Sequence, residues 1–158
     1  FEALSKVDKS LLDGWEIKIA GSGRQEAELK QMASNLGLNI KFLGHISDVS
    51  KLYSEAKIFT LCSRSEGLSN VLIEAGASRC ARISSDTVGG RELITNGVDG
   101  ILFENENEDE LAGALNSLLS DEALIERIAD NAARNSSEFS IKNIMGKWRN
   151  LIDEVVRS

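Results

Sequence analysis

Two glutamates, Glu66 and Glu74, frame the part of this chain whose residues are best suited to chemistry. Between them stand a glycine, a Ser-Asn pair and an apolar run, a pattern that predicts a loop leading into a helix. The first N–H groups of a helix lack intrahelical partners and attract anions. Carboxylates beside them can accept hydrogen bonds from sugar hydroxyls. A phosphate flanked by hydroxyls describes a nucleotide sugar, so the segment predicts a site for such a ligand.

A second loop that could meet phosphate contains Gly21 and Gly23, directly after an apolar run at residues 15–20. Glycine lets the backbone approach a phosphate closely, and the helix expected next would present its N–H groups. A tight turn between strand and helix needs the same residues, and the third glycine of a dinucleotide fingerprint is absent. The neighbouring Arg24 could pair with phosphate or face solvent, and both alternatives remain open.

Short apolar runs alternate with amphipathic stretches along the chain, which predicts an α/β fold. Strands are expected at residues 15–20, 39–43, 57–61, 81–85 and 100–103. Helices are expected at residues 1–12, 25–36, 48–56, 70–78, 108–120, 121–135 and 141–156. This alternation predicts a doubly wound, Rossmann-like domain with a parallel sheet of about five strands covered on both faces. Ligands of such sheets bind beyond the carboxyl ends of the strands.

Composition narrows the class of protein. The chain has 158 residues, of which 42% are hydrophobic and 27% charged, and these values suit one globular domain with a substantial core. The net charge of −7 argues against a general nucleic-acid binder. No apolar run reaches transmembrane length. Cys62 and Cys80 form no metal motif, and we expect two reduced thiols in a cytosolic protein.

Residues 63–75 read Ser-Arg-Ser-Glu-Gly-Leu-Ser-Asn-Val-Leu-Ile-Glu-Ala. This segment resembles the donor-binding signature of retaining glycosyltransferases of family four, enzymes with two facing Rossmann-like domains. The resemblance covers nearly the whole chain, because further segments agree with the family in the same order. They are residues 21–23, 42–45, 86–90, 92–94 and 96–100.

The resemblance assigns a role to each of the two glutamates. Glu74 would accept hydrogen bonds from the ribose hydroxyls of the donor, whereas without a ligand it would be an ordinary carboxylate on a helix surface. Glu66 would be the catalytic-site residue that contacts a ring hydroxyl of the donor sugar near the anomeric carbon. Its alternative is a loop carboxylate that caps the next helix.

The loop between the glutamates would bind the donor diphosphate. Backbone groups of Ser69, Asn70 and Val71 would contact the phosphates, and Gly67 belongs to the same donor-binding loop. Leu72 would pack under the ribose or, equally well, belong to the core.

Two further loops follow other strands of the expected sheet. His45 and Ile46 lie after the second strand and, by resemblance, would meet the nucleotide base mainly through backbone groups. His45 is the only histidine, and we expect a residue near the base rather than a general base. Residues 86–90 could approach the ligand or only begin a short helix, and we expect a structural role.

Several positions depart from the family pattern, and the chain has no proline at all. Ser69 stands where the family has proline, and a serine there can cap the helix. Arg79 stands at a C-cap where the family has glycine, so its backbone is expected to be strained. Arg82 replaces an apolar strand residue and must therefore reach solvent or a partner.

The resemblance implies a retaining glycosyltransferase of polysaccharide biosynthesis that moves a hexose from a nucleoside-diphosphate sugar to a glycan or lipid-linked acceptor. It implies no essential metal or other cofactor. This chain would be the C-terminal, donor-binding domain without its first strand. The acceptor-binding domain, and an Arg and a Lys that stabilise the leaving diphosphate, would lie elsewhere, so the chain alone is expected to be inactive. We expect a cytoplasmic location at the inner face of the membrane, with peripheral association of the full-length protein.

Two other functions are compatible with parts of the sequence. The first is a non-catalytic nucleotide-binding module, since proline and glycine are lost near the site. The second is a fragment of a nicotinamide-dependent oxidoreductase. The incomplete glycine pattern, and the lack of a suitably placed acidic residue after a second strand, argue against it.

Overall fold

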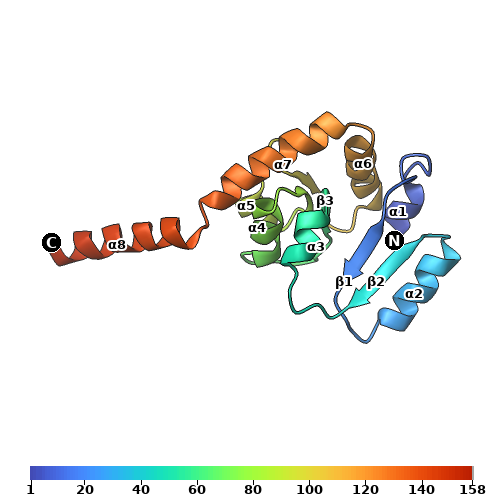
Figure 1. The fold of residues 1–158 in the computed structure, drawn as a ribbon, viewed down its shortest axis with the longest axis horizontal. Helices are drawn as coiled ribbons and strands as arrows, with labels where there is room; N and C mark the ends of the chain where they lie inside the picture. Colours follow the sequence, from blue (N-terminus) through green and yellow to red (C-terminus); the bar gives the residue numbers. More distant parts are fainter. Residues whose placement is uncertain (158) are drawn as a thin grey trace.

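The computed structural model, which describes residues 1–157, alternates helices and strands along most of the chain (Figure 1). The strands are β1 (Ile17–Ala20), β2 (Ile40–Gly44), β3 (Ile58–Leu61), β4 (Ala81–Ser85) and β5 (Ile101–Phe103). The helices are α1 (Glu2–Lys6), α2 (Glu26–Asn35), α3 (Ser50–Glu55), α4 (Asn70–Ala77), α5 (Val88–Leu93), α6 (Glu108–Leu119), α7 (Glu122–Ser137) and α8 (Ile141–Arg157). The predicted α/β class and all five predicted strands are confirmed.

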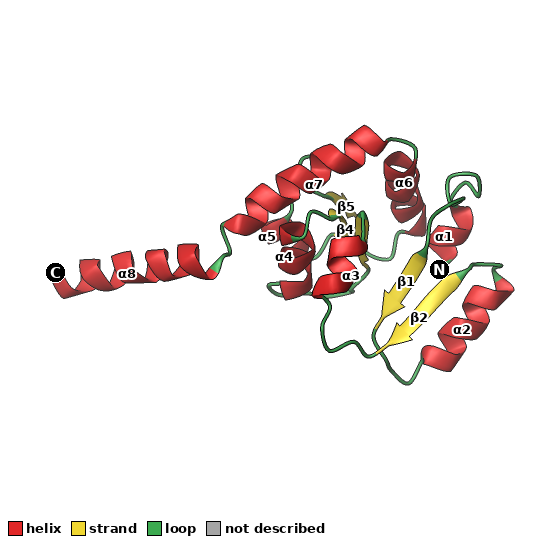
Figure 2. Cartoon of the chain, viewed as in Figure 1, coloured by secondary structure: helices red, strands yellow, loops and turns green. Residues whose placement is uncertain are grey.

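All strand pairs are parallel, but the hydrogen bonds divide the sheet into two parts. Strands β1 and β2 pair with each other, and β3, β4 and β5 form a three-stranded sheet in that order. Figure 2 shows the β1–β2 pair beside α2, apart from the other strands. Within residues 1–157, β1 pairs only with β2 and β3 only with β4, so each of these two strands has one edge without a strand partner.

The main core lies where α1, α6 and α7 pack against the three-stranded sheet. Every residue of β4 is buried, as expected for a central parallel strand covered on both faces. Ile83 of β4, Leu118 of α6 and Ile128 of α7 are completely buried. Burying one such side chain contributes about 1.5–3 kcal/mol. This core fixes the strands from which the candidate loops extend.

Two helices are shorter than the sequence predicts, and an aspartate explains each difference. The helix expected over residues 1–12 ends at Lys6, because the Asp8 carboxylate accepts hydrogen bonds from the backbone and hydroxyl of Ser10. Helix α3 begins at Ser50 instead of residue 48, and Asp48 accepts the corresponding bonds from Ser50. Such local side-chain bonds compete with helical hydrogen bonding.

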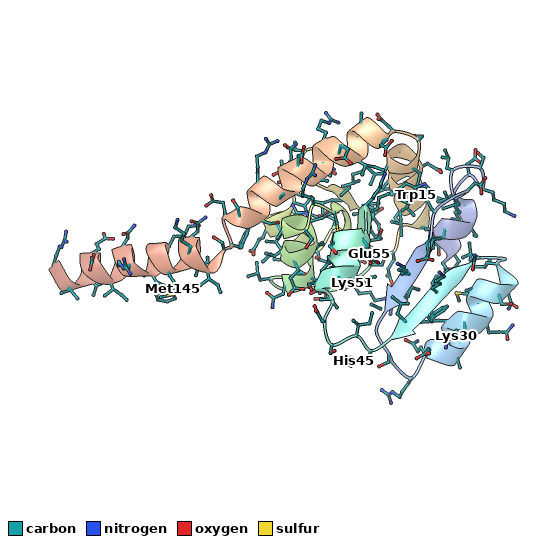
Figure 3. The ribbon with its side chains drawn as sticks, viewed as in Figure 1. Trp15, Lys30, His45, Lys51, Glu55 and Met145 are labelled. Carbon is teal, nitrogen blue, oxygen red and sulfur yellow. The ribbon has the colours of Figure 1, made fainter. Side chains whose placement is uncertain are left out.

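Helix α8 extends away from the rest of the molecule (Figures 1 and 3), and none of its residues is buried. Its apolar side chains recur with helical spacing and are largely exposed, including Ile141, Met145, Trp148 and Leu151. None of the helices in residues 1–157 combines the length and apolar character needed to cross a membrane.

Candidate functional site

The loop between β3 and α4 carries the residues that the sequence singled out. Ser69 is the extended N-cap residue of α4, and its carbonyl accepts the first helical bond, from Leu72. We expected its hydroxyl to cap the helix, and this is wrong: it makes no cap hydrogen bond. Ser69 is 3% exposed, and among the described residues its Oγ has no hydrogen-bond partner. Within residues 1–157, no side chain therefore caps the N–H groups that begin α4.

Leu72 belongs to the core, which decides between its two expected roles. The side chain is completely buried and packs with Leu93 and Ile94. The core alternative is therefore the one that the structure shows, since no part of the side chain reaches solvent. The preceding residues Asn70 and Val71 are exposed and can meet a ligand.

Glu66 is held in place through both its backbone and its side chain. The hydroxyl of Ser63 donates a hydrogen bond of 2.6 Å to Glu66 Oε1. The carbonyl of Ser63 accepts a bond of 2.5 Å from the hydroxyl of Ser85, which is buried at the end of β4. The carbonyl of Glu66 accepts a bond of 3.1 Å from the N–H of Gly89. The half-buried Glu66 carboxylate is thus positioned by β4 and α5 together.

Helix α5 supports the loop that carries Glu66. The sequence predicts a structural role and a short helix for residues 86–90, but not this contact with the Glu66 loop. Thr87, the N-cap residue of α5, accepts a hydrogen bond of 3.1 Å from Gly90 N. A Cβ on Gly89 would lie 1.4 Å from the Gly67 carbonyl oxygen, and one on Gly90 would lie 2.8 Å from that of Ser85. Two glycines at a helix start, where propensity is poor, were the sequence signal for this close approach.

Glu74 is exposed on α4, about one turn after the helix begins. It lies beside Tyr53 of α3, which is 7% exposed and packs edge-to-face on Phe59 with ring centroids 5.7 Å apart. Burial, and next the charge of the Glu74 carboxylate, raise the pKa of Tyr53 to about 12. Glu74 therefore sits between a buried phenol and solvent, where it can accept hydrogen bonds from a ligand.

The loops after β1 and β2 form a second group. Gly21 N donates a hydrogen bond of 2.7 Å to Gly44 O, and both glycines have positive φ, +130° and +65°. Gly23 and Arg24 follow in an exposed stretch before α2. His45, labelled in Figure 3, is exposed and Ile46 is half-buried.

The two groups of loops follow different parts of the divided sheet. Glu66, Gly67 and Ser69 lie at the three-stranded part and Gly21, Gly23 and His45 at the two-stranded part. In residues 1–157 no hydrogen bond or ion pair joins them. The carboxyl ends of parallel strands carry both groups, as the sequence predicts.

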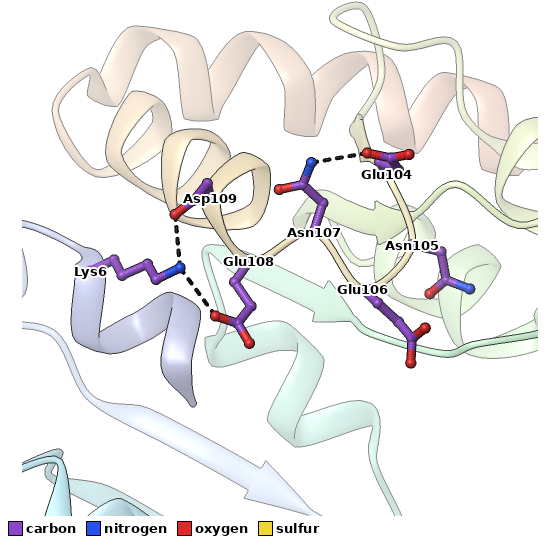
Figure 4. Close-up of a pocket in the computed structure, with 7 residues that line it drawn as sticks. All are labelled: Lys6, Glu104, Asn105, Glu106, Asn107, Glu108 and Asp109. Carbon is purple, nitrogen blue, oxygen red and sulfur yellow. Dashed lines mark hydrogen bonds and ion pairs between the residues drawn. The ribbon is translucent and has the colours of Figure 1, made fainter.

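A hollow of about 400 Å³ lies elsewhere, between α1 and the loop before α6 (Figure 4). It is lined by Lys6 and residues 104–109, of which four are acidic. The charge of Lys6 is already paired with Glu108 at 3.1 Å and Asp109 at 2.8 Å. The remaining negative charge disfavours a diphosphate there.

Among the described residues, no group of three or more His, Cys, Asp and Glu side chains is arranged to hold a metal ion. Both cysteines are free thiols: Cys62 is exposed at the end of β3, and Cys80 is buried.

Solved glycosyltransferases contain a domain with this fold. The crystal structure of Anabaena Alr3699/HepE in complex with UDP-glucose matches with a TM-score of 0.84 and 25% identity, over 97% of this chain and 43% of that one. The pneumococcal O-GlcNAc transferase GtfA in complex with UDP and GlcNAc matches with a TM-score of 0.83 and 26% identity, over 99% and 32%. The fold is therefore that of a Rossmann-like domain of glycosyltransferases.

The family follows from the sequence. The profile described as "Glycosyl transferases group 1" matches residues 1–135, and the chain belongs to this family. A Campylobacter jejuni relative is 37% identical over 155 residues, which are 98% of this chain and 43% of that protein. It is the GalNAc-alpha-(1->4)-GalNAc-alpha-(1->3)-diNAcBac-PP-undecaprenol alpha-1,4-N-acetyl-D-galactosaminyltransferase. The chain thus spans less than half the length of this curated relative.

Proposed function

We propose that this chain is the donor-binding domain of a retaining glycosyltransferase that uses a nucleoside-diphosphate sugar. The observation that carries the proposal is the start of α4, which lies between Glu66 and Glu74. No side chain of the described residues caps its N–H groups. A helix N-terminus of this kind stabilises phosphate through free N–H groups and the helix dipole. Since HepE and GtfA were solved with UDP or UDP-glucose, UDP is the first nucleotide to test.

Each residue of the loop then has a defined task. Glu74 accepts hydrogen bonds from the ribose hydroxyls, and Glu66 contacts a hydroxyl of the donor sugar. The backbone of Ser69, Asn70 and Val71 meets the diphosphate, with Gly67 allowing the loop to turn. As the anomeric carbon gains positive charge, these N–H groups stabilise the departing diphosphate.

The loops of the two-stranded sheet complete the donor site. Gly21, Gly23 and Arg24 face the phosphates, where an exposed guanidinium can pair with them. His45 and Ile46 meet the nucleotide base through their backbone. Base selection then depends little on side-chain identity.

A longer protein would supply the other half of the active site. Among residues 1–157, β1 and β3 each pair with a strand on one side only, and one further parallel strand between them would join the two parts into one doubly wound sheet. The C. jejuni relative is more than twice as long as this chain. We place the acceptor-binding domain, and the cationic side chains that assist the leaving diphosphate, in that further part. Residues 1–158 alone would then bind donor without catalysing transfer.

The acceptor would be a glycan or a lipid-linked saccharide. This proposal draws on the C. jejuni relative, whose name specifies an undecaprenol-linked substrate. The full-length protein would then assemble a polysaccharide or glycolipid at the cytoplasmic face of the membrane, with peripheral attachment. Following the family, no metal is essential, and turnover should survive EDTA.

Titration calorimetry with UDP, GDP and ADP, and with NAD as a control, tests the donor site. We expect preference for one diphosphate and roughly tenfold weaker binding by Glu74→Ala, because the ribose hydroxyls lose a charged hydrogen-bond acceptor. Glu154→Ala, an exposed carboxylate of α8, is the charge-matched control and should bind normally.

Other results would favour the other functions. Tight binding of NAD would favour the oxidoreductase. Donor binding without transfer by the full-length protein would favour a non-catalytic module. Failure of the full-length protein to bind any nucleoside diphosphate would contradict the donor-site proposal.

A further inference from the structure

A buried arginine lies behind the proposed donor loop. Arg82 stands in the middle of β4 and is completely buried, at a position where an apolar residue was expected. Its charge is opposed by the Asp99 carboxylate, with Nη2 and Oδ1 3.4 Å apart. Asp99 is itself nearly buried, and its carboxylate also accepts a hydrogen bond of 2.8 Å from Thr95 N.

The guanidinium connects several elements through their carbonyl groups. Nη1 donates to Leu72 O of α4 at 3.3 Å, and Nη2 donates to Leu93 O, the last carbonyl of α5, at 3.1 Å. Nε and Nη2 both donate to Asp99 O, at 3.2 and 3.0 Å. A planar group with five N–H donors can satisfy such a set, whereas lysine or an apolar residue cannot.

Neighbouring residues leave room for Arg82. A Cβ on Gly76 of α4 would lie 3.0 Å from Arg82 Nη1 and 2.2 Å from Ser136 Oγ of α7. Ser136 in turn lies 3.5 Å from Nη1 as a further acceptor. Gly76 leaves space for the guanidinium, Ser136 offers it an acceptor and Asp99 balances its charge. The surroundings of Arg82 therefore suit an arginine in size, hydrogen bonding and charge.

Stability alone does not explain this arrangement. Desolvating two charges costs several kcal/mol per ion, and well-packed apolar replacements of buried ion pairs are often neutral or stabilising. The pKa of Arg82 is lowered, because burial outweighs the opposing effect of the Asp99 charge. The guanidinium instead fixes the relative position of two helices, because it donates hydrogen bonds to one defined carbonyl in each.

Those two helices frame the Glu66 loop. Leu72 lies in the first turn of α4, whose N–H groups face the proposed diphosphate, and α5 holds the Glu66 carbonyl through Gly89 N. We infer that Arg82 is a positioning residue that fixes α4 relative to α5 and so sets the geometry of the donor loop. The inference rests on the proposed function for its effect on nucleotide binding, but not for its effect on the loop itself.

The test replaces the pair without leaving a buried charge, in the full-length protein. Arg82→Met with Asp99→Asn keeps the volume, and asparagine still accepts from Thr95 N. Arg79→Met with Asp130→Asn is the matched control, since it removes an exposed pair, joined by a 2.8 Å hydrogen bond, that also links the end of α4 to α7. Three quantities are measured: the unfolding midpoint, the UDP affinity and the amide hydrogen exchange of residues 67–73 and 88–90.

We expect the Arg82–Asp99 double variant to unfold at a lower temperature, because Leu93 O and Asp99 O lose their donors. Measured well below that midpoint, where the protein stays folded, its UDP affinity should still fall roughly three- to thirtyfold. Amides of residues 67–73 should exchange faster than in the control pair. Arg82→Lys keeps the charge but loses the planar fork. It should show the same loss of UDP affinity in the folded protein, to a lesser degree.

Unchanged affinity and unchanged exchange would overturn the inference. A loss of affinity that follows the loss of stability in both the double variant and Arg82→Lys would also overturn it, because the residue would then be purely structural. Absence of UDP binding by the unmodified protein would contradict the proposed function instead. The exchange measurement, which needs no nucleotide, would still decide on Arg82.

Discussion

The Gly89 N–H donates a hydrogen bond of 3.1 Å to the Glu66 carbonyl, so a helix start holds the loop that carries the candidate catalytic carboxylate. This contact allows almost no space for a side chain. A Cβ added to Gly89 would lie 1.4 Å from the carbonyl oxygen of Gly67, which is backbone and cannot rotate away. The position of the loop between β3 and α4 therefore depends on a glycine outside that loop.

Gly89→Ala should displace the loop and weaken diphosphate binding at least tenfold, since overpacking of this kind costs about 1–3 kcal/mol. Gly113→Ala is the control, because Gly113 lies exposed within α6 and nothing would meet its Cβ within 4 Å. That change should stabilise the protein by about 0.5–1 kcal/mol. Calorimetry and chemical unfolding measure both effects. Normal diphosphate affinity in Gly89→Ala would show that the loop does not need this support.

Much of the fold could be predicted because its signals are local. Apolar runs gave all five strands, and amphipathic spacing gave α6, α7 and α8 to within a few residues. The length of helix α1 was overestimated because the apolar pattern continues to Leu12, whereas the local bonds from Ser10 to Asp8 follow the end of the helix. The pairing of individual strands was not predicted, although a domain without its first strand would leave such a gap between β1 and β3.

The site was predicted in part for a similar reason. The glutamates and the start of α4 are encoded by contiguous residues. The uncapped Ser69 hydroxyl, the core position of Leu72 and the buried Arg82–Asp99 pair depend on elements distant in sequence. Arg82 shows the limit: the sequence required a partner for its charge, and only the structure identifies Asp99.

The titration of Tyr53 measures whether the Glu74 carboxylate lies close enough to raise the pKa of the phenol. The chain has one tyrosine, so tyrosinate absorbance near 295 nm follows this residue alone. Burial and the Glu74 charge raise its pKa from 10.0 to about 12, so ionisation should be complete only in strong alkali. Glu74→Gln should lower the pKa, since one cause of the shift is removed. An unaltered titration in this variant would place Glu74 too far from Tyr53 to act on it.

The raised pKa of Tyr53 makes the free energy of unfolding depend on pH. A group whose pKa is higher in the folded state stabilises the fold fully below its unfolded pKa and loses that contribution as pH rises through the folded value. The Tyr53 contribution should therefore be intact below pH 10 and disappear toward pH 12. Tyr53→Phe, which cannot ionise, should show a smaller decline in unfolding free energy over that interval.

Arg79 tests the strain expected from the sequence, and the structure confirms its left-handed backbone with φ of 60°. That conformation costs a non-glycine residue about 1–2 kcal/mol. Its exposed ion pairs with Asp130 and Glu126 stabilise the fold by at most about 1 kcal/mol. Arg79→Gly should therefore match or exceed the original stability, whereas Arg79→Ala loses the pairs and keeps the strain. Chemical unfolding measures the difference, and an alanine variant as stable as the glycine variant would disprove the strain.

The two thiols should differ in reactivity in the folded protein. Burial raises the pKa of Cys80 to about 11, and its Sγ contacts the carbonyls of Tyr53 and Ala56, both at 3.4 Å. Because the thiolate is the reactive form, Cys80 should resist a thiol reagent at pH 8 until the protein unfolds. Partial burial also raises the pKa of Cys62, but this thiol is accessible to solvent and should react first. Cys62→Ser should remove the fast phase, and a fast phase that persists would mean that Cys80 is accessible.

Helix α8 should contribute little to folding of the remaining domain. It has no buried residue, and Ile141, Met145 and Trp148 are 83%, 59% and 57% exposed. Ending the chain at Ser140 should therefore leave the thermal unfolding midpoint nearly unchanged, because little apolar burial is lost. An exposed apolar face of this length promotes association, so the shortened chain should sediment as a monomer at concentrations where the longer chain self-associates. Trp148→Ser in the longer chain should reduce association in the same direction. A large fall in the unfolding midpoint on truncation would show instead that α8 packs against the domain.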